Sequence, residues 1–169
     1  MNFRELKIRI IILVAVISLG VLFGARFAYE HLFLGSLKEA FLSIDGVADL
    51  KVERGQQTNL VVTLERVERL ESTYGAIRAL AEERLGNHWT VELVDQRNGE
   101  LVERYHQLHY ALWQAISTGD FVEMADRVEA VTQGLDARIT VDRDFIYVEL
   151  ETEDGYLYEI MPRQGGQAS

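Results

Sequence analysis

The 169-residue sequence contains no cysteine. A chain without thiols has no disulfide framework, no thiolate nucleophile and no cysteine-ligated metal. The absence also fits an exported protein, because an unpaired thiol is a liability outside the cell. The sequence further lacks a P-loop, a G-x-G-x-x-G turn and a Ser-His-Asp order. We therefore predict no cofactor and a protein that is not an enzyme.

Positive charge is also scarce, with 17 Lys and Arg against 27 Asp and Glu and a net charge of −10. Residues 1–34 carry four basic and two acidic groups, which leaves −12 for residues 35–169. Such an acidic body has no basic stripe to neutralise phosphates, so nucleic acid is excluded as an expected partner. The same charge disfavours a body that lies flat on anionic lipid.

One long apolar run stands out, residues 10–25 (IIILVAVISLGVLFGA), which contains no charged side chain. Flanking arginines can keep their stems in the apolar layer, so we predict a transmembrane helix over residues 9–29 that contacts membrane lipid. Residues 1–8 form its basic leader. A cleaved signal peptide is the first alternative, but Arg26 occupies a cleavage position that requires a small residue. A buried helix of a globular core is the second alternative.

Basic residues set the expected orientation of this helix. Arg4, Lys7 and Arg9 precede it, whereas Arg26 and Lys38 follow it at a distance. The positive-inside rule then predicts a single-pass protein of the cell membrane. Its N-terminus is cytoplasmic, and its C-terminal domain is extracytoplasmic.

Small residues line one face of the predicted anchor. Gly20 and Gly24 form a GxxxG pattern that Ala28 extends by one turn. Such spacing lets two membrane helices approach closely, so these residues are candidates for a helix–helix contact and a homo-oligomer. The alternative is that glycine is simply common in membrane helices.

Residues 30–97 show the pattern of an αββαβ module. Helical spacing, alternation and glycine stops define its elements, which are 31–41 (helix), 47–54 (strand), 59–64 (strand), 67–85 (helix) and 89–94 (strand). Gly35 could act as a swivel in the first helix.

The αββαβ order over residues 36–95 resembles small modules of membrane-tethered envelope-assembly proteins, such as ring-building-motif domains. The whole chain resembles uncharacterised single-pass membrane proteins of Gram-positive, endospore-forming bacteria. The resemblance of the whole chain implies a location at the cell membrane and little about function.

The pattern of residues 98–163 predicts a second module, which contains two helices and a β-meander and packs against the first module. Thr118 or Asp120 can cap its second helix, and Asp154-Gly155 is a hairpin signal. The expected elements are 99–117 (helix), 121–133 (helix), 137–141 (strand), 145–151 (strand) and 156–161 (strand). Residues 164–169 are an expected disordered tail. The predicted fold class is thus α+β, with an N-terminal transmembrane helix, and whether the modules share one sheet is open.

Glu103, His106 and His109 form E-x-x-H-x-x-H on one predicted helix. This spacing could direct three ligands at one metal, as in di-iron bundles. The neighbouring helix supplies carboxylates but no histidine, and His109 lies beside a core stripe. A hydrogen-bonded structural histidine is therefore the favoured interpretation.

The last hairpin concentrates carboxylates and tyrosines. A buried pair of carboxylates could do acid–base chemistry, but alternation places Glu149 and Glu151 on the predicted solvent face. Tyr147, Tyr156 and Tyr158 could form a partner-binding surface or cross-strand packing contacts.

The favoured hypothesis is a membrane-anchored, non-enzymatic extracytoplasmic protein that binds other envelope proteins. The alternative is a small metal-dependent enzyme that uses the helix face of Glu103, His106 and His109.

Overall fold

A computed structural model describes residues 18, 20 and 33–163 of the chain, which divides into two compact units, Met1–Glu39 and Ala40–Ser169. Ser18 and Gly20 are helical, as are residues 33–42, so Gly35 lies inside a helix. No helix within the described residues is long and apolar enough to cross a membrane. The leader, most of the predicted anchor and the predicted tail lie outside the described residues.

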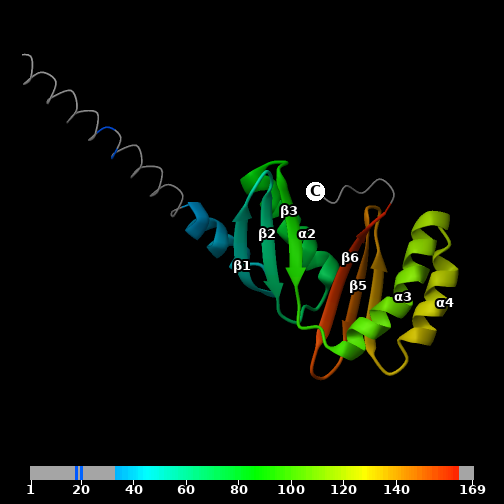
Figure 1. Ribbon diagram of the computed structural model, residues 1–169. Helices are drawn as coiled ribbons and strands as arrows, with labels where there is room; N and C mark the ends of the chain where they lie inside the picture. Colours follow the sequence, from blue (N-terminus) through cyan, green and yellow to red (C-terminus); the bar gives the residue numbers. More distant parts are fainter. Residues whose placement is uncertain (1–17, 19, 21–32, 164–169) are drawn as a thin grey trace, which may run out of the picture. The chain divides into compact units, whose positions relative to one another are not determined.

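The first sheet, here sheet A, follows the helix at residues 33–42 (Figure 1). Strands β1 (Val47–Arg54) and β2 (Thr58–Leu64) pair antiparallel, and β2 then pairs parallel with β3 (Trp89–Val94). Helix α2 (Leu70–Leu85) connects β2 to β3. The predicted αββαβ order is confirmed, and it forms a mixed sheet with strand order β1-β2-β3.

Sheet A buries one face. Leu60, Val62 and Leu64 alternate along β2 and are fully buried, as alternation predicts for a half-covered strand. Helix α2 contributes Leu70 and Ile77 to the same core. It begins three residues later than predicted. Arg69 is extended, with φ −148° and ψ 108°, so the preceding residues form a loop instead of a first helical turn.

The second sheet, sheet B, follows two helices. Helix α3 (Gly99–Thr118) starts where the Asn98 side chain accepts the Leu101 N–H. Helix α4 (Phe121–Val131) starts where Asp120 accepts the Glu123 N–H, which selects Asp120 among the predicted caps. The strands β4 (Asp136–Val141), β5 (Phe145–Glu151) and β6 (Tyr156–Pro162) form an antiparallel sheet in sequence order.

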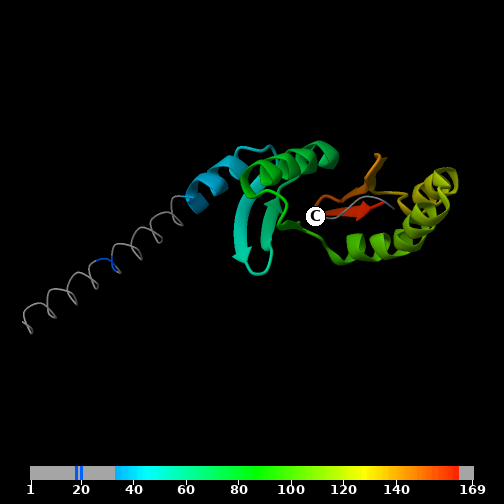
Figure 2. The same cartoon turned by 90° about the horizontal axis from the view of Figure 1, so that it is seen from above.

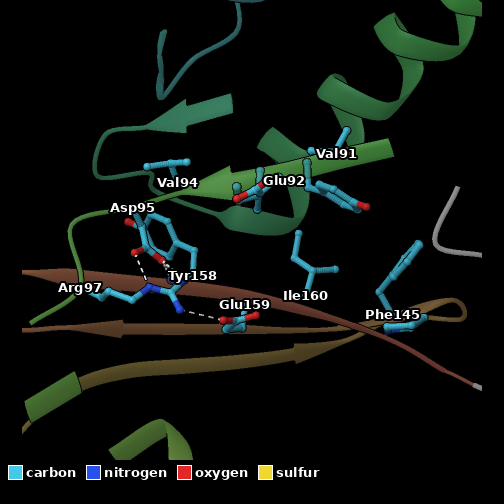
Figure 3. A pocket seen from close by; sticks show the side chains of 12 residues that line it. Val91, Glu92, Val94, Asp95, Arg97, Phe145, Tyr158, Glu159 and Ile160 are labelled. Atoms are coloured by element: carbon cyan, nitrogen blue, oxygen red, sulfur yellow. Dashed lines mark hydrogen bonds and ion pairs between the residues drawn. The ribbon is translucent and has the colours of Figure 1, made fainter. Parts of the chain in front are cut away.

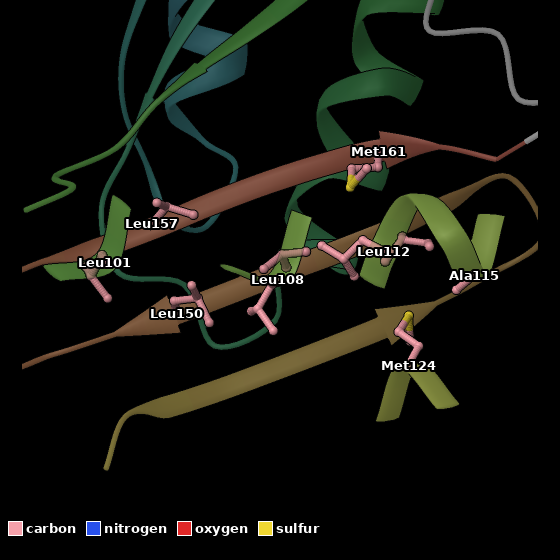
Figure 4. Close-up of a cluster of buried hydrophobic side chains, with 10 residues drawn as sticks. Leu101, Leu108, Leu112, Ala115, Met124, Leu150, Leu157 and Met161 are labelled. Atoms are coloured by element: carbon pink, nitrogen blue, oxygen red, sulfur yellow. The ribbon is translucent and has the colours of Figure 1, made fainter. Parts of the chain in front are cut away.

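Helices α3 and α4 cover one face of sheet B (Figure 1). Leucines of α3 and Met124 of α4 meet alternate residues of β5 in an apolar core (Figure 4). Its fully buried members include Leu108, Leu112, Ile146, Val148, Leu150 and Leu157. This core holds the second module together.

The other face of sheet B is covered as well, because α2 packs against β5 (Figure 2). Residues 145–150 of β5 are consequently all buried. The prediction that Glu149 lies on a solvent face is wrong, since only 4% of this residue is exposed. Alternation assigned the residue to the correct face of the strand, but an element from the first module covers that face.

Candidate functional site

A cleft of about 590 Å³ lies between β3 of sheet A and β6 of sheet B (Figure 3). Each strand is the last of its sheet within the part of the chain that the structure describes. Val91 and Leu93 line the cleft from β3, and Ile160 lines it from β6. The volume lies in the range of sites that bind ligands or peptide side chains.

One end of the cleft is closed. Gln96 and Tyr156 form an isolated antiparallel bridge, in which the Tyr156 N–H donates to the Gln96 carbonyl at 3.0 Å. The Tyr158 N–H donates to Asp95 Oδ2 at 2.8 Å. These bonds hold β3 and β6 together at this end, and among the described residues no further bridge joins the two strands.

An ion-pair network lies at the closed end (Figure 3). The Arg97 guanidinium contacts Asp95 Oδ1 at 2.8 Å and Glu159 Oε1 at 3.0 Å. The Asp95 side chain is only 1% exposed. Its hydrogen bonds raise the pKa of Arg97 further above the usual arginine range, so the guanidinium keeps its charge. Both carboxylates are thus paired with a permanent cation.

Aromatic rings line the opposite part of the cleft. Tyr74 of α2 and Phe145 of β5 meet edge to face, with centroids 5.6 Å apart. The Arg78 guanidinium lies 4.8 Å from the Phe145 centroid. Burial raises the pKa of Tyr74, so this hydroxyl stays protonated at neutral pH and does not act as a base. The cleft therefore has an apolar aromatic part and an acidic part.

The polar groups of the cleft pair with one another. Asp95 and Glu159 both pair with the single cation Arg97, and burial raises the pKa of the Tyr158 hydroxyl. None of these groups is arranged as a nucleophile with its base, the geometry that covalent catalysis requires. Glu92 is exposed on β3, where it adds negative charge to the rim of the cleft.

The three tyrosines of the last hairpin make internal contacts. The Tyr158 hydroxyl accepts the Val67 N–H at 3.0 Å and donates to Glu151 at 2.8 Å. Tyr147 donates to Asp142 Oδ2, and Tyr156 donates to the Leu64 carbonyl. Tyr147 and Tyr158 are buried, so the packing alternative describes these two residues and an exposed partner surface does not.

The carboxylates of β5 form a second cluster, away from the cleft. A cavity of about 220 Å³ is lined by Arg138, Glu149 and Glu151. Burial raises the pKa of Glu149, although the Leu70 backbone amide and Arg138 oppose the shift. Glu151 accepts hydrogen bonds from Arg66 and Tyr158. These carboxylates thus link the two modules beside this cavity.

The structure does not bring the E-x-x-H-x-x-H residues together as a ligand set. Glu103 and His106 are exposed, and Glu103 accepts a hydrogen bond from Gln107. His109 packs edge to face against Tyr105 and other aromatic rings of α3. Within residues 18, 20 and 33–163, no group of three His, Asp or Glu side chains could hold a metal ion.

The glycine face of the predicted anchor is described at one position only. Gly20 is helical and exposed, with no atom within 4 Å of the place where a Cβ would lie. Gly24 and Ala28 lie outside the described residues. The helix–helix contact therefore stays a prediction.

Comparison with protein-family models, with curated proteins and with solved structures found no match for this chain. The class of the protein, α+β, is therefore assigned from its fold alone. Sequence reasoning placed Val91 and Leu93 on a strand but did not single them out as site residues. The closest available signal was Asp95-Gln96-Arg97, two opposite charges directly after a strand.

Proposed function

We propose that this chain is a non-enzymatic, membrane-anchored extracytoplasmic protein that binds other envelope proteins through the cleft between β3 and β6. The cleft itself carries the proposal. It lies between two sheet edges, and its charged groups pair with one another instead of converging on a reacting centre. Sheet edges are common sites of protein association.

The location rests on the sequence. The apolar run at residues 10–25 and the basic residues before it support an anchor with an extracytoplasmic domain. A phosphatase that is active only outside the cytoplasm, fused after Arg163, should then be active. Added protease should degrade the domain in intact protoplasts. Full protection of the domain would contradict this orientation.

Binding at the cleft can be tested by photo-crosslinking in membranes. We would place a photo-reactive amino acid at Leu93 or Ile160, which line the cleft, and at Val122, which is 76% exposed on α4. A partner protein crosslinked from both cleft positions, but not from Val122, would support the proposal. The absence of any protein adduct at the cleft positions would overturn it.

Self-association of the anchor is a separate part of the proposal. Replacing Gly20 and Gly24 by leucine fills the groove that close helix approach requires. Crosslinked full-length protein should then shift from dimer toward monomer, whereas Val16→Leu should leave the ratio unchanged. Equal dimer fractions in all three proteins would assign the glycines no role in contact.

A further inference from the structure

Strands β3 and β6 each present an unpaired backbone edge to the cleft. The Thr58 N–H donates to the His88 carbonyl, so alternation in the parallel ladder directs the backbone of Thr90 and Glu92 toward β2. The backbone N–H and C=O groups of Val91 and Leu93 consequently point away from β2. They lie on the side of β3 that faces the cleft.

The same reasoning applies to β6. The Tyr156 and Tyr158 N–H groups donate to Gln96 and Asp95, away from β5. Two residues further on, the N–H and C=O groups of Ile160 point to the same side, because strand backbones alternate with a period of two. Ile160 thus presents a donor and an acceptor opposite those of β3.

We propose that the cleft binds an extended cationic peptide segment of a partner protein, which pairs with the edges of β3 and β6 as an added strand. This inference rests on the proposed function and specifies its partner. Strand addition is a general mode of peptide recognition, in which backbone hydrogen bonds supply affinity and alternate side chains supply specificity.

The bridge at the closed end fixes how such a segment can enter. Gln96 and Tyr156 pair antiparallel, so β3 and β6 run in opposite directions (Figure 1). An added strand is therefore parallel to one of them and antiparallel to the other. The segment must lie between the bridge and the far end of β6, where Pro162 has no N–H to donate.

The two faces of the cleft differ in chemistry. Val91 and Leu93 share a face with the buried Leu60 and Val62, their register partners on β2. This face also receives Phe145 of β5. Alternate side chains of a bound segment would meet Val91 and Leu93, which are half-buried and line the cleft. Apolar residues at every second position are therefore favoured.

The opposite face is acidic. Glu92 projects from it on β3, and Glu159 projects from β6 on the same lining (Figure 3). With Asp95 counted, the lining has three carboxylates against the guanidinium of Arg97, and a second guanidinium, that of Arg78, lies over Phe145. The net charge of the lining is negative, so the remaining side chains of the segment should be lysine or arginine.

Binding of synthetic peptides to the full-length protein in detergent tests the inference. The probes are labelled KVKVKV, its acidic counterpart EVEVEV, and KVKVKV methylated at alternate backbone nitrogens. We expect KVKVKV to bind at least about tenfold more tightly than either other probe. Equal binding of KVKVKV and EVEVEV would overturn the charge argument. Equal binding of the methylated probe would overturn strand addition.

A variant of β3 tests the same edge from the protein side. Proline at Leu93 removes an outward N–H and leaves the ladder to β2 intact, because edge strands tolerate proline there. Leu93→Pro should bind KVKVKV at least about tenfold more weakly than Leu93→Ala, which loses the same side-chain contacts but keeps the backbone N–H. If Leu93→Pro fails to fold, the methylated peptide decides the question on the unaltered protein.

Hydrogen exchange supplies a third readout. Bound KVKVKV should slow exchange at least about tenfold in residues 89–94 and 157–162, and should leave residues 121–131 of α4 unchanged. Protection at neither edge would overturn strand addition. If photo-crosslinks from the cleft trap a partner while all peptide tests fail, the proposed function stands and this inference falls. If the crosslinked protein is a second copy of this chain, the cleft mediates self-association, and the inference of a cationic partner segment is wrong.

Discussion

Sheets A and B contain three strands each but are covered differently. Sheet A is buried on the face that carries Leu60 and Val62, while Lys51 and Glu92 are exposed. Sheet B is covered on both faces, by α3 and α4 on one and by α2 on the other. Apolar and polar side chains consequently alternate along its central strand β5, although residues on both faces of the strand are buried.

This difference explains why a polar residue has a different role in each sheet. On sheet A the charged side chains face water. On the α2-facing side of sheet B, Glu149, Glu151 and Tyr158 instead contact the first module. The junction, where the first module meets this side of sheet B, is polar. Each polar group that is buried there needs a hydrogen-bond partner.

The largest expected effect concerns the apolar core of sheet B. Leu150→Ala removes a fully buried side chain of β5 and should lower the free energy of unfolding by about 2–5 kcal/mol. Val94→Ala on sheet A, where 37% of the residue is exposed, should cost less than about 1 kcal/mol. Denaturant unfolding of the full-length protein in detergent measures both. Similar losses in the two variants would contradict the difference in coverage.

A somewhat smaller effect is expected at the junction. Tyr158→Phe leaves the buried Val67 N–H without its acceptor and Glu151 without one donor. Its cost should be about 1–3 kcal/mol, the penalty for an unsatisfied buried group. Tyr110→Phe is the matched control, because Tyr110 is 80% exposed on α3. The junction contact would be unimportant for stability if the two variants were equally stable.

Much of the fold could be predicted from local pattern. The strands Val47–Arg54, Trp89–Val94 and Phe145–Glu151 have the bounds that alternation and turn residues predicted. Helix ends were less accurate. Helix α4 stops at Val131, two residues earlier than predicted, a difference within the one or two residues by which helix ends commonly vary.

The candidate site could not be predicted in the same way. The two strands that flank it, β3 and β6, are far apart in the sequence, since residues 95–155, including α3 and α4, lie between them. Local alternation fixes which side chains share a face of one strand, but it contains no information on which edges become neighbours. For the same reason the burial of Glu149 was missed.

A pH-dependent effect of intermediate size is expected at Glu149. Burial raises its pKa in the folded protein, so the folded state holds this proton more tightly than the unfolded chain. The resulting stabilisation is complete below the unfolded pKa of about 4.3 and is lost as the pH rises through the folded pKa. Glutamine stays neutral, so Glu149→Gln should gain stability relative to the unaltered protein as the pH rises above the unfolded pKa of about 4.3.

Denaturant unfolding at several pH values measures this difference. Glu129→Gln on the exposed surface of α4 is the control, and it should change the free energy of unfolding by less than about 0.5 kcal/mol throughout. The prediction would be wrong if the free energies of unfolding of Glu149→Gln and the unaltered protein changed equally with pH. Water or Arg138 would then compensate fully for the burial of this carboxylate.

The smallest expected effect concerns Arg66, which joins the modules at the edge of the junction. Its guanidinium contacts Glu151 Oε2 and the Thr152 carbonyl, both at 2.6 Å, and its side chain is 42% exposed. Arg66→Lys keeps the charge but loses the planar fork, and should cost no more than about 1 kcal/mol because exposed pairs are screened by water. The loss should shrink further in about 1 M salt.

Arg127→Lys provides the comparison within one helix, since Arg127 pairs with Glu123 four residues away on α4 and both side chains are about half exposed. Such pairs contribute about 0.3–0.5 kcal/mol, so Arg66→Lys should cost only slightly more. A salt-independent loss of about 3 kcal/mol at Arg66 would mean that the guanidinium acts as a buried link between the sheets. The junction would then be as closed to water as the core of sheet B, and the two modules would unfold as one unit.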